Sequence, residues 1–356
     1  MNKKIFIIIP TVLICFCALF IIFRFKFIPT KNPVTQNKNF ITQNEDNMII
    51  KPEQTPDNTE FISQTEVDLP IIKAGEIATE KSIYTDKNGQ TVIIPKDFKV
   101  SSKEDEQTIN HGLVIIDSNE NEFVWVSTLN TDFKRNDFWT SFYTNVLSES
   151  KWYGYWDDIN NEKYKNMKES VEIYSGFYIS RYEVSKDNWN NPKSKKVTQE
   201  SSDNIWVQIS PQDITILCEN MYKDNDTVQW FFPRGVNYDT VFQWLIDTND
   251  KSESDIMIDS SSWGNYTNSS FTNGIRYWTA GMWEETKANN IYDLAGNYWE
   301  WTQERYWNDN YVMRGGGYNI MWMACNGDSY PASLRDPLPW NNHHPNVGFR
   351  IGLYIK

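Results

Sequence analysis

The sequence predicts an α+β fold with much irregular loop, preceded by an N-terminal transmembrane helix and a flexible polar stalk. An uninterrupted apolar run occupies residues 5–23, and a polar stretch with few large apolar residues follows at residues 29–70. Beyond residue 70, short strand patterns are mixed with helix patterns and many turn residues. With 356 residues, 40% of them hydrophobic, the chain is long enough for one large domain or two small ones.

The apolar run predicts a signal anchor within residues 1–28. Its length is about that of a bilayer-spanning helix, and Lys3 and Lys4 precede it while Arg24 and Lys26 follow it. The alternative is a cleaved signal peptide, but the run is long for one and no small-x-small cleavage site follows. The short N-terminal side favours an orientation with the N-terminus inside. The sequence therefore predicts a single-pass protein of the cell membrane with its folded domain outside the cytoplasm.

Composition restricts what the remainder of the chain can be. Residues 29–70 are rich in Asn, Gln, Thr and Glu and cannot bury a core, which predicts a flexible stalk. The net charge of −13, without a basic cluster outside the extreme N-terminus, argues against nucleic-acid binding. Of four cysteines, only Cys218 and Cys325 lie outside the apolar run, so a disulfide scaffold is excluded, although these two can form one bond.

Residues 71–126 predict an N-terminal β-rich extension of the folded part. A turn precedes a strand at residues 91–94, and residues 113–126 read as a hairpin with a polar loop. A short helix is then expected at residues 161–171, followed by a strand at residues 176–184.

Two further helices are expected before a long loop region. Ser210, followed by Pro211 at the first helical position, is a good helix start, and the apolar positions continue to Met221. A second helix opens near residue 232 and carries apolar side chains through residue 245. The Ser-, Asn- and Gly-rich residues 252–290 read mainly as loop, and no internal repeat is visible.

The most informative segment is Asn290-Ile-Tyr-Asp-Leu-Ala-Gly-Asn-Tyr-Trp-Glu-Trp301, which places an acidic residue inside an aromatic run. A carboxylate at Glu300 is costly to desolvate unless it is paired or binds a cation. Asp293 and Glu300, with backbone carbonyls of the intervening turn, are hard oxygen ligands of the kind that calcium prefers. The alternative is that Glu300 pairs with an arginine such as Arg314 or Arg350, without a metal.

Together with Arg314-Gly-Gly-Gly-Tyr318 and Val347-Gly-Phe-Arg350, this segment resembles the C-terminal signature of the formylglycine-generating enzyme (sulfatase-modifying factor) family. The fold of that family is related to C-type lectins. Residues 176–184 and 209–218 are similar to its entry strand and following helix, so the resemblance runs roughly from residue 94 to residue 356. It implies a membrane-anchored bacterial version of the domain, placed at residues 127–356. It also implies a structural calcium site formed by the Asp293 and Glu300 side chains with the Gly296 and Tyr298 carbonyls.

The sequence matches only part of the family's catalytic site. Active members hold copper between two cysteines that follow the glycine-rich turn, and soft thiolates suit that ion. The matching positions here are Ile320 and Cys325, so only one thiol is present and copper is not expected. Cys325 is the one candidate catalytic residue should activity exist, and the alternative is that it is a small buried hydrophobe. Whether the chain is an enzyme is left open, with a non-catalytic domain favoured.

Aromatic and amide side chains near the C-terminus predict a recognition surface instead. Such side chains on loops are what recognition sites on rigid scaffolds use, and aromatic faces beside Asn or Asp suit sugars. The expected ligand is a surface glycan or protein. Two alternatives are a sulfatase-maturation-type oxidoreductase with an atypical site and a structural envelope-assembly protein. The residues expected to bind the ligand are Tyr318, Trp322, Asn326, Tyr330, Trp340 and Asn342.

Overall fold

The computed structural model describes residues 69–136, 155–187, 189, 191–198, 200, 204–267, 269–272, 279–307, 310–318, 331–339 and 341–356. The predicted anchor and nearly all of the predicted stalk lie outside these residues. None of the helices within the described ranges is long and apolar enough to cross a membrane. The anchor, the stalk and the orientation of the chain therefore stay predictions.

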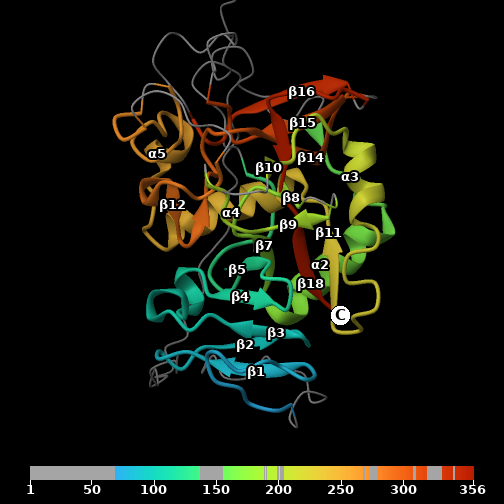
Figure 1. The fold of residues 1–356 in the computed structure, drawn as a ribbon, viewed down its shortest axis with the longest axis vertical. Coiled ribbons are helices and arrows are strands. Elements are labelled where there is room, and N and C mark those ends of the chain that lie inside the picture. The colour runs from blue at the N-terminus through green and yellow to red at the C-terminus, as the bar shows by residue number, and fades with distance from the viewer. Residues whose placement is uncertain are drawn as a thin grey trace, which may run out of the picture. The chain divides into compact units, whose positions relative to one another are not determined.

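The described chain is a mixed α/β fold with few helices and many strands in curled sheets (Figure 1). The larger sheet has six antiparallel strands, and it joins residues from both ends of the described chain. The predicted domain boundary at residues 126 and 127 falls inside one of its strands. In spatial order its strands are β11 (Val228–Phe231), β18 (Gly352–Ile355), β7 (Gly176–Ser180), β5 (Glu122–Ser127), β4 (Val114–Asp117) and β3 (Phe98–Val100).

The second sheet brings together the three motifs that the sequence analysis singled out. Glu300 of the Trp-Glu-Trp strand lies opposite Arg314 on one side and Gly348 on the other. The first pairing is antiparallel and the second is parallel, and β14 has an irregularity between Trp301 and Arg305. The strands are β16 (Arg335–Pro339), β15 (Asn310–Arg314), β14 (Trp299–Tyr306) and β17 (Val347–Phe349), with β6 (Tyr155–Trp156) paired to the end of β14.

Short elements complete the strands. The predicted strand at residues 91–94 is confirmed as β2, and the predicted hairpin is confirmed as β4 and β5. The remaining short elements are β1 (Ser82–Thr85), β2 (Thr91–Ile94), β8 (Ser185–Lys186), β9 (Pro192–Lys193), β10 (Asn204–Ile205), β12 (Lys287–Ala288), β13 (Ile291–Tyr292), and the 3₁₀ turns η1 (Glu104–Glu106), η2 (Ile109–His111) and η3 (Glu284–Thr286).

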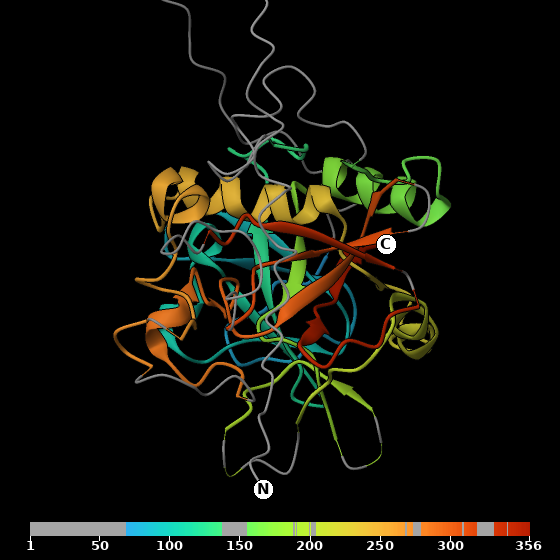
Figure 2. The ribbon, with the colours of Figure 1, turned by 90° about the horizontal axis from the view of Figure 1, so that it is seen from above.

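The helices are α2 (Glu162–Tyr174), α3 (Pro211–Cys218), α4 (Gly235–Asp247) and the short α5 (Glu253–Met257). The start of α3 is confirmed, because Ser210 accepts a hydrogen bond from the Asp213 backbone while the Asp213 side chain bonds the Ser210 backbone. The helix ends at Cys218, three residues before the predicted end. Helix α4 contacts both β5 and β14, and thus lies between the two large sheets. Seen from above, the gold α4 and the green α2 lie along the same side of the described fold (Figure 2).

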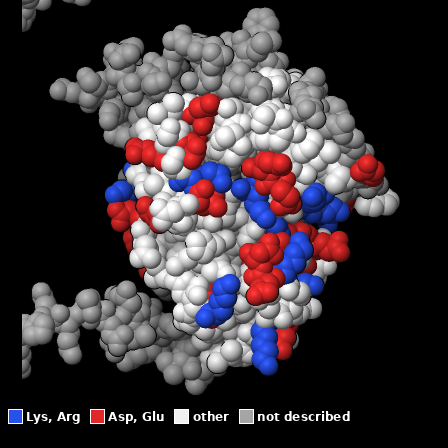
Figure 3. Space-filling view, turned by 90° about the vertical axis from the view of Figure 1, so that its left-hand side faces the viewer, with Lys and Arg blue, Asp and Glu red and all other residues white. Residues whose placement is uncertain are grey.

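Aromatic side chains fill much of the core. Trp244 and Trp301 are among the largest fully buried side chains, and Trp125, Trp230, Trp263 and Trp299 are also buried. The large apolar surface of these rings supplies much of the area whose burial stabilises a fold with so much loop. On the face shown in Figure 3, acidic and basic side chains are interspersed.

Candidate functional site

Glu300 lies in the middle of β14, and its carboxylate is buried and paired. Arg350 Nε donates to Glu300 Oε1 at 2.7 Å, and the Tyr238 hydroxyl donates to Oε2. The same guanidinium donates to the backbone carbonyls of Ser180 and Arg181, both at 3.2 Å. Of the two alternatives for Glu300, pairing with an arginine is what the structure shows, and the arginine is Arg350.

The other residues predicted to bind calcium are buried nearby, and the hydrogen bonds of Gly296 and Tyr298 use their N–H groups rather than the carbonyls predicted as ligands. Asp293 Oδ2 accepts from the Gly281 backbone N–H at 2.6 Å, and the Gly296 backbone N–H donates to the Gly315 carbonyl at 2.9 Å. The Tyr298 backbone N–H donates to Glu183 Oε1 at 3.0 Å. Burial raises the pKa of Asp293, because desolvation disfavours the charged form.

The structure shows how the Glu300 carboxylate is held by protein groups alone. Both carboxylate oxygens already accept hydrogen bonds, and the buried guanidinium of Arg350 supplies the positive charge that the carboxylate needs. Calcium takes six to eight oxygen ligands, and a carboxylate oxygen that accepts one hydrogen bond keeps a second lone pair, so the implied calcium site stays a proposal. Within the described ranges, no group of three or more His, Cys, Asp or Glu residues is placed to hold a metal ion.

A second buried ionic cluster lies between α4 and the second sheet, where three arginines converge on two carboxylates. Arg314 donates to Glu304 at 3.0 Å and to Asp239 at 2.8 Å. Arg335 donates to Glu304 at 3.0 Å and to both oxygens of Asp239 at 2.6 and 2.7 Å. Arg135 Nε donates to Asp239 at 3.1 Å, and its Nη2 contacts Glu304. We call these five residues the arginine cluster, and the burial of all of them except the partly exposed Arg135 points to a structural role.

Most of the recognition surface predicted from the sequence lies outside the described residues. Trp322, Asn326, Tyr330 and Trp340 are among these, as are Ile320 and Cys325. Tyr318 is half-buried, and its backbone N–H donates to the Asn297 carbonyl at 2.8 Å. Asn342 is also half-buried, and its backbone N–H donates to the Pro339 carbonyl at 3.0 Å. The structure therefore does not test whether the six residues form one surface.

Two nucleophile candidates among the described residues are unsuited to catalysis. Cys218 is a free thiol that is fully buried, and burial raises its pKa to about 12, so little thiolate forms at neutral pH. Ser210 Oγ donates to Asp213 Oδ2 at 2.5 Å, and His343 Nε2 lies 2.8 Å from the same oxygen. The carboxylate thus stands between the hydroxyl and the imidazole, whereas a serine triad needs the histidine in that place.

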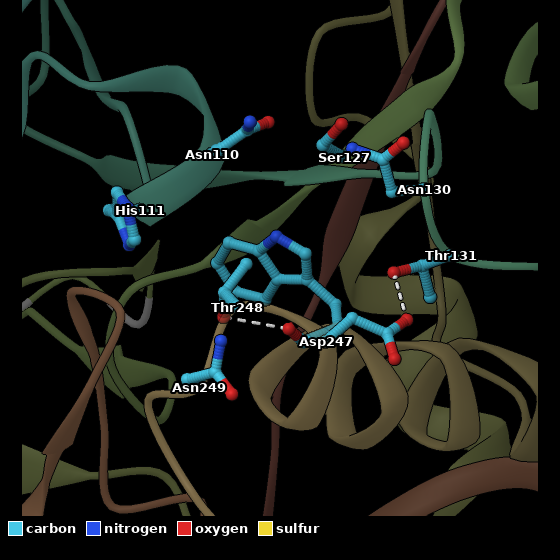
Figure 4. Close-up of a pocket in the computed structure, with 9 residues that line it drawn as sticks. Asn110, His111, Ser127, Asn130, Thr131, Asp247, Thr248 and Asn249 are labelled. Atoms are coloured by element: carbon cyan, nitrogen blue, oxygen red, sulfur yellow. Dashed lines mark hydrogen bonds between the residues drawn. The ribbon is translucent and has the colours of Figure 1, made fainter.

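A polar pocket of about 260 Å³ opens at the C-terminal end of α4 (Figure 4). Three segments build it, and the third lies far from the first two in the sequence. These are η2, the end of β5 with its following loop, and the last turn of α4. Its lining consists of Asn110 and His111, then Ser127, Asn130 and Thr131, then Trp244, Asp247, Thr248 and Asn249.

Local structure fixes the side chains on the helix side of the pocket. Thr131 Oγ1 donates to Asp247 Oδ2, and Gln243 Nε2 donates to Asp247 Oδ1, both at 2.7 Å. Thr248 caps α4 and its hydroxyl donates to the Trp244 carbonyl at 2.7 Å. The carboxylate of Asp247 is therefore held in place from both sides.

Trp244 is the most buried residue of the pocket lining, with 1% of its surface exposed. Its indole Nε1–H has no hydrogen-bond partner among the described residues. A buried donor without a partner costs about 1–3 kcal/mol, and such groups in folded proteins call for an explanation. Because Trp244 lines a pocket, one explanation is that a bound ligand supplies the acceptor atom for this N–H.

The pocket could not be predicted from the sequence, because no local motif encodes it. Asn110 and His111 belong to the predicted N-terminal extension, whereas Asn130 and the end of α4 belong to the predicted main domain. The one signal in the sequence is that amide and hydroxyl residues cluster where the apolar pattern of α4 stops, at Asp247-Thr-Asn-Asp250.

Compared with known proteins, the chain matches no family model, and no curated protein matches its sequence. The resemblance to the formylglycine-generating enzyme family accordingly rests on the motifs quoted above.

Proposed function

We propose that this chain is a membrane-anchored extracytoplasmic recognition protein whose domain is of the formylglycine-generating-enzyme type and is not catalytic. Support for the domain type comes from the second sheet, where the strands of the Trp-Glu-Trp, Arg-Gly-Gly-Gly and Gly-Phe-Arg motifs are neighbours. Support for the anchor comes from the apolar residues 5–23 and the polar stretch that follows.

The observation that carries the recognition proposal is the pocket at the end of α4. It combines exposed amide side chains at its rim, Asn130 and Asn249, with buried hydroxyl groups of Ser127 and Thr131 deeper in its lining. Binding sites use a few placed polar groups of this kind to orient a ligand, and they occur where separate parts of a fold meet.

The proposal predicts that a small molecule binds in this pocket. The full chain in detergent is screened by thermal unfolding against a library that holds neutral, anionic and cationic compounds. Binding to the folded state adds about 2.7 kcal/mol of stability at a ligand concentration one hundred times the Kd. Asn130→Ala removes an exposed amide from the rim and is expected to weaken binding about tenfold while leaving the unfolding temperature without ligand unchanged.

Asn119→Ala is the matched control, because Asn119 is also an exposed asparagine but does not line the pocket. It is expected to bind as the parent chain does. If no compound of any charge stabilises the parent, or if both variants lose binding equally, the pocket is not a recognition site.

Calcium at Asp293 and Glu300 is implied by the family resemblance alone and is a separate proposal. It predicts that a chelator lowers the melting temperature of the parent chain by several degrees and has no effect on Glu300→Gln. Pairing of Glu300 with Arg350 alone predicts that the parent melts at the same temperature with and without chelator. Calorimetry of both chains, with and without EGTA, decides between the two.

The predicted surface from Tyr318 to Trp340 is likewise open to a direct test. Trp322→Ala and Trp340→Ala lose ligand binding if that surface recognises the ligand, and they keep it if the α4 pocket does.

A further inference from the structure

We propose that the pocket at the end of α4 binds a neutral, hydroxyl-bearing ring such as a single sugar unit, with a ligand oxygen accepting the hydrogen bond of Trp244 Nε1–H. This inference rests on the proposed recognition function and adds the chemical class of the ligand. Four features of the pocket carry it, namely its charge, its unused donor, its mixture of polar groups and its size.

The charge of the pocket disfavours an anionic ligand. Asp247 is its one carboxylate, and none of the described residues that line it is Lys or Arg. The pocket also lies at the C-terminal end of α4, where the helix dipole places partial negative charge. A phosphate or carboxylate would meet repulsion from both without a Lys or Arg of the described lining to pair with.

The donor of Trp244 disfavours a purely cationic ligand. An indole N–H can only donate, and an ammonium group can only donate as well, so neither can satisfy the other. Both oxygens of Asp247 already accept hydrogen bonds from Thr131 and Gln243, so an ammonium group would compete with these donors for the carboxylate. A hydroxyl or ether oxygen that carries no charge accepts from the N–H without these penalties.

The remaining side chains suit hydroxyl groups. Asn110, Asn130 and Asn249 each offer an amide that both donates and accepts, and Ser127 adds a hydroxyl. A ligand hydroxyl also donates and accepts, so several of them can be matched by such a set at once. Figure 4 shows Asn110 and Ser127 on the side of the pocket opposite Asp247 and Asn249. A ring with hydroxyls on several edges can therefore be contacted from both sides.

The size of the pocket limits the ligand to one small ring. Its volume of about 260 Å³ is below the range of about 300–1,000 Å³ that drug-sized molecules occupy. A longer glycan can be held by one of its units, with the remainder outside.

The test is isothermal titration calorimetry of the full chain in detergent. The probes are glucose, galactose, mannose and N-acetylglucosamine, with glucuronate and glucosamine as charged counterparts of the same ring. At least one neutral sugar is expected to bind, and its charged counterparts are expected to bind at least about tenfold more weakly. Trp244→Phe keeps an aromatic ring but removes the N–H, and it is expected to weaken binding about tenfold.

Trp283→Phe is the matched control, because Trp283 also has an Nε1–H without a partner among the described residues but does not line the pocket. Melting temperatures of both variants show whether a loss of binding reflects a loss of folding. The inference is overturned if glucuronate or glucosamine binds as tightly as the neutral sugars, or if Trp244→Phe binds like the parent. If sugars fail but a charged library compound binds with dependence on Asn130, recognition stands and the sugar inference falls. If nothing binds at all, the recognition proposal fails with it.

Discussion

Glu304→Gln is expected to destabilise the folded chain by about 3–5 kcal/mol, because it removes a fully buried negative charge that pairs with three arginines. Glutamine has the same shape, so the loss comes from charge and not from packing. The guanidinium groups of Arg135, Arg314 and Arg335 would be left with Asp239 as the one carboxylate that they share. A drop in melting temperature on the order of 10 °C is expected in calorimetry.

The same residue gives the effect a defined pH dependence. Burial disfavours the charged form of Glu304, but the positive charges of Arg135, Arg335 and Arg314 outweigh it and lower its pKa to about 2. Because the folded pKa lies below the unfolded one, the contribution is complete above the unfolded pKa and is lost as the pH falls from there towards 2. The difference in unfolding free energy between parent and Glu304→Gln should shrink by about 3 kcal/mol between pH 7 and pH 2.

Glu172→Gln is the matched control for this experiment. Glu172 pairs with Lys168 at 3.3 Å on the surface of α2, where both side chains are at least half exposed. Such a pair contributes about 0.3–0.5 kcal/mol, so the control should melt close to the parent. Equal effects of the two substitutions at pH 7 would show that the arginine cluster does not contribute as a buried network.

Gly112→Ala is expected to cost more than about 3 kcal/mol, since the new methyl group has no room and the backbone conformation is left-handed. Gly112 has a φ of 83°, and an added Cβ would lie 1.8 Å from the Asn289 carbonyl oxygen. That oxygen belongs to the backbone, so relief requires the β12–β13 turn to move. The turn is also held by Asn290 Nδ2, which donates to the Gly112 carbonyl at 2.9 Å.

Gly89→Ala separates the two causes. Gly89 has a similar φ of 78°, but an added Cβ there meets no atom within 4 Å. Its cost should be the conformational part alone, about 1 kcal/mol. Urea unfolding of both variants gives the comparison, and a loss at Gly112 no larger than that at Gly89 would contradict the close approach of the Asn289 backbone.

The elements that could be predicted from the sequence are those whose signals are local. Ser210 and Pro211 mark the start of α3 by their own capping chemistry, and the polar residues 117–121 mark the hairpin between β4 and β5. Local signals could not decide whether Arg314 or Arg350 pairs with Glu300. Arg314 lies directly opposite Glu300 across the sheet, yet its guanidinium turns to Glu304 and Asp239, while Arg350 bonds Glu300.

Neither the pocket nor the arginine cluster could be predicted from the sequence, and the physical reason is the same for both. Each includes side chains that meet in space although they are more than a hundred residues apart in the sequence, namely Thr131 with Asp247 and Arg135 with Asp239. Hydrophobic periodicity reports which face of an element is buried, but not which other element covers it. The predicted domain boundary at residue 127 falls inside β5. The pairing of β5 with β7 has no local signal in the sequence that would have placed the boundary elsewhere.

The position of β18 within the larger sheet has a consequence for the order in which the chain can fold during synthesis. Residues 352–355 are translated long after residues 176–180, yet β18 lies between β7 and β11. Until it emerges, β7 presents an unpaired edge, and β11 lacks the single neighbour that it has among the described strands. An exposed strand edge is a template for pairing with other chains. We therefore expect the nascent protein to be most prone to pairing with other chains until β18 closes the sheet.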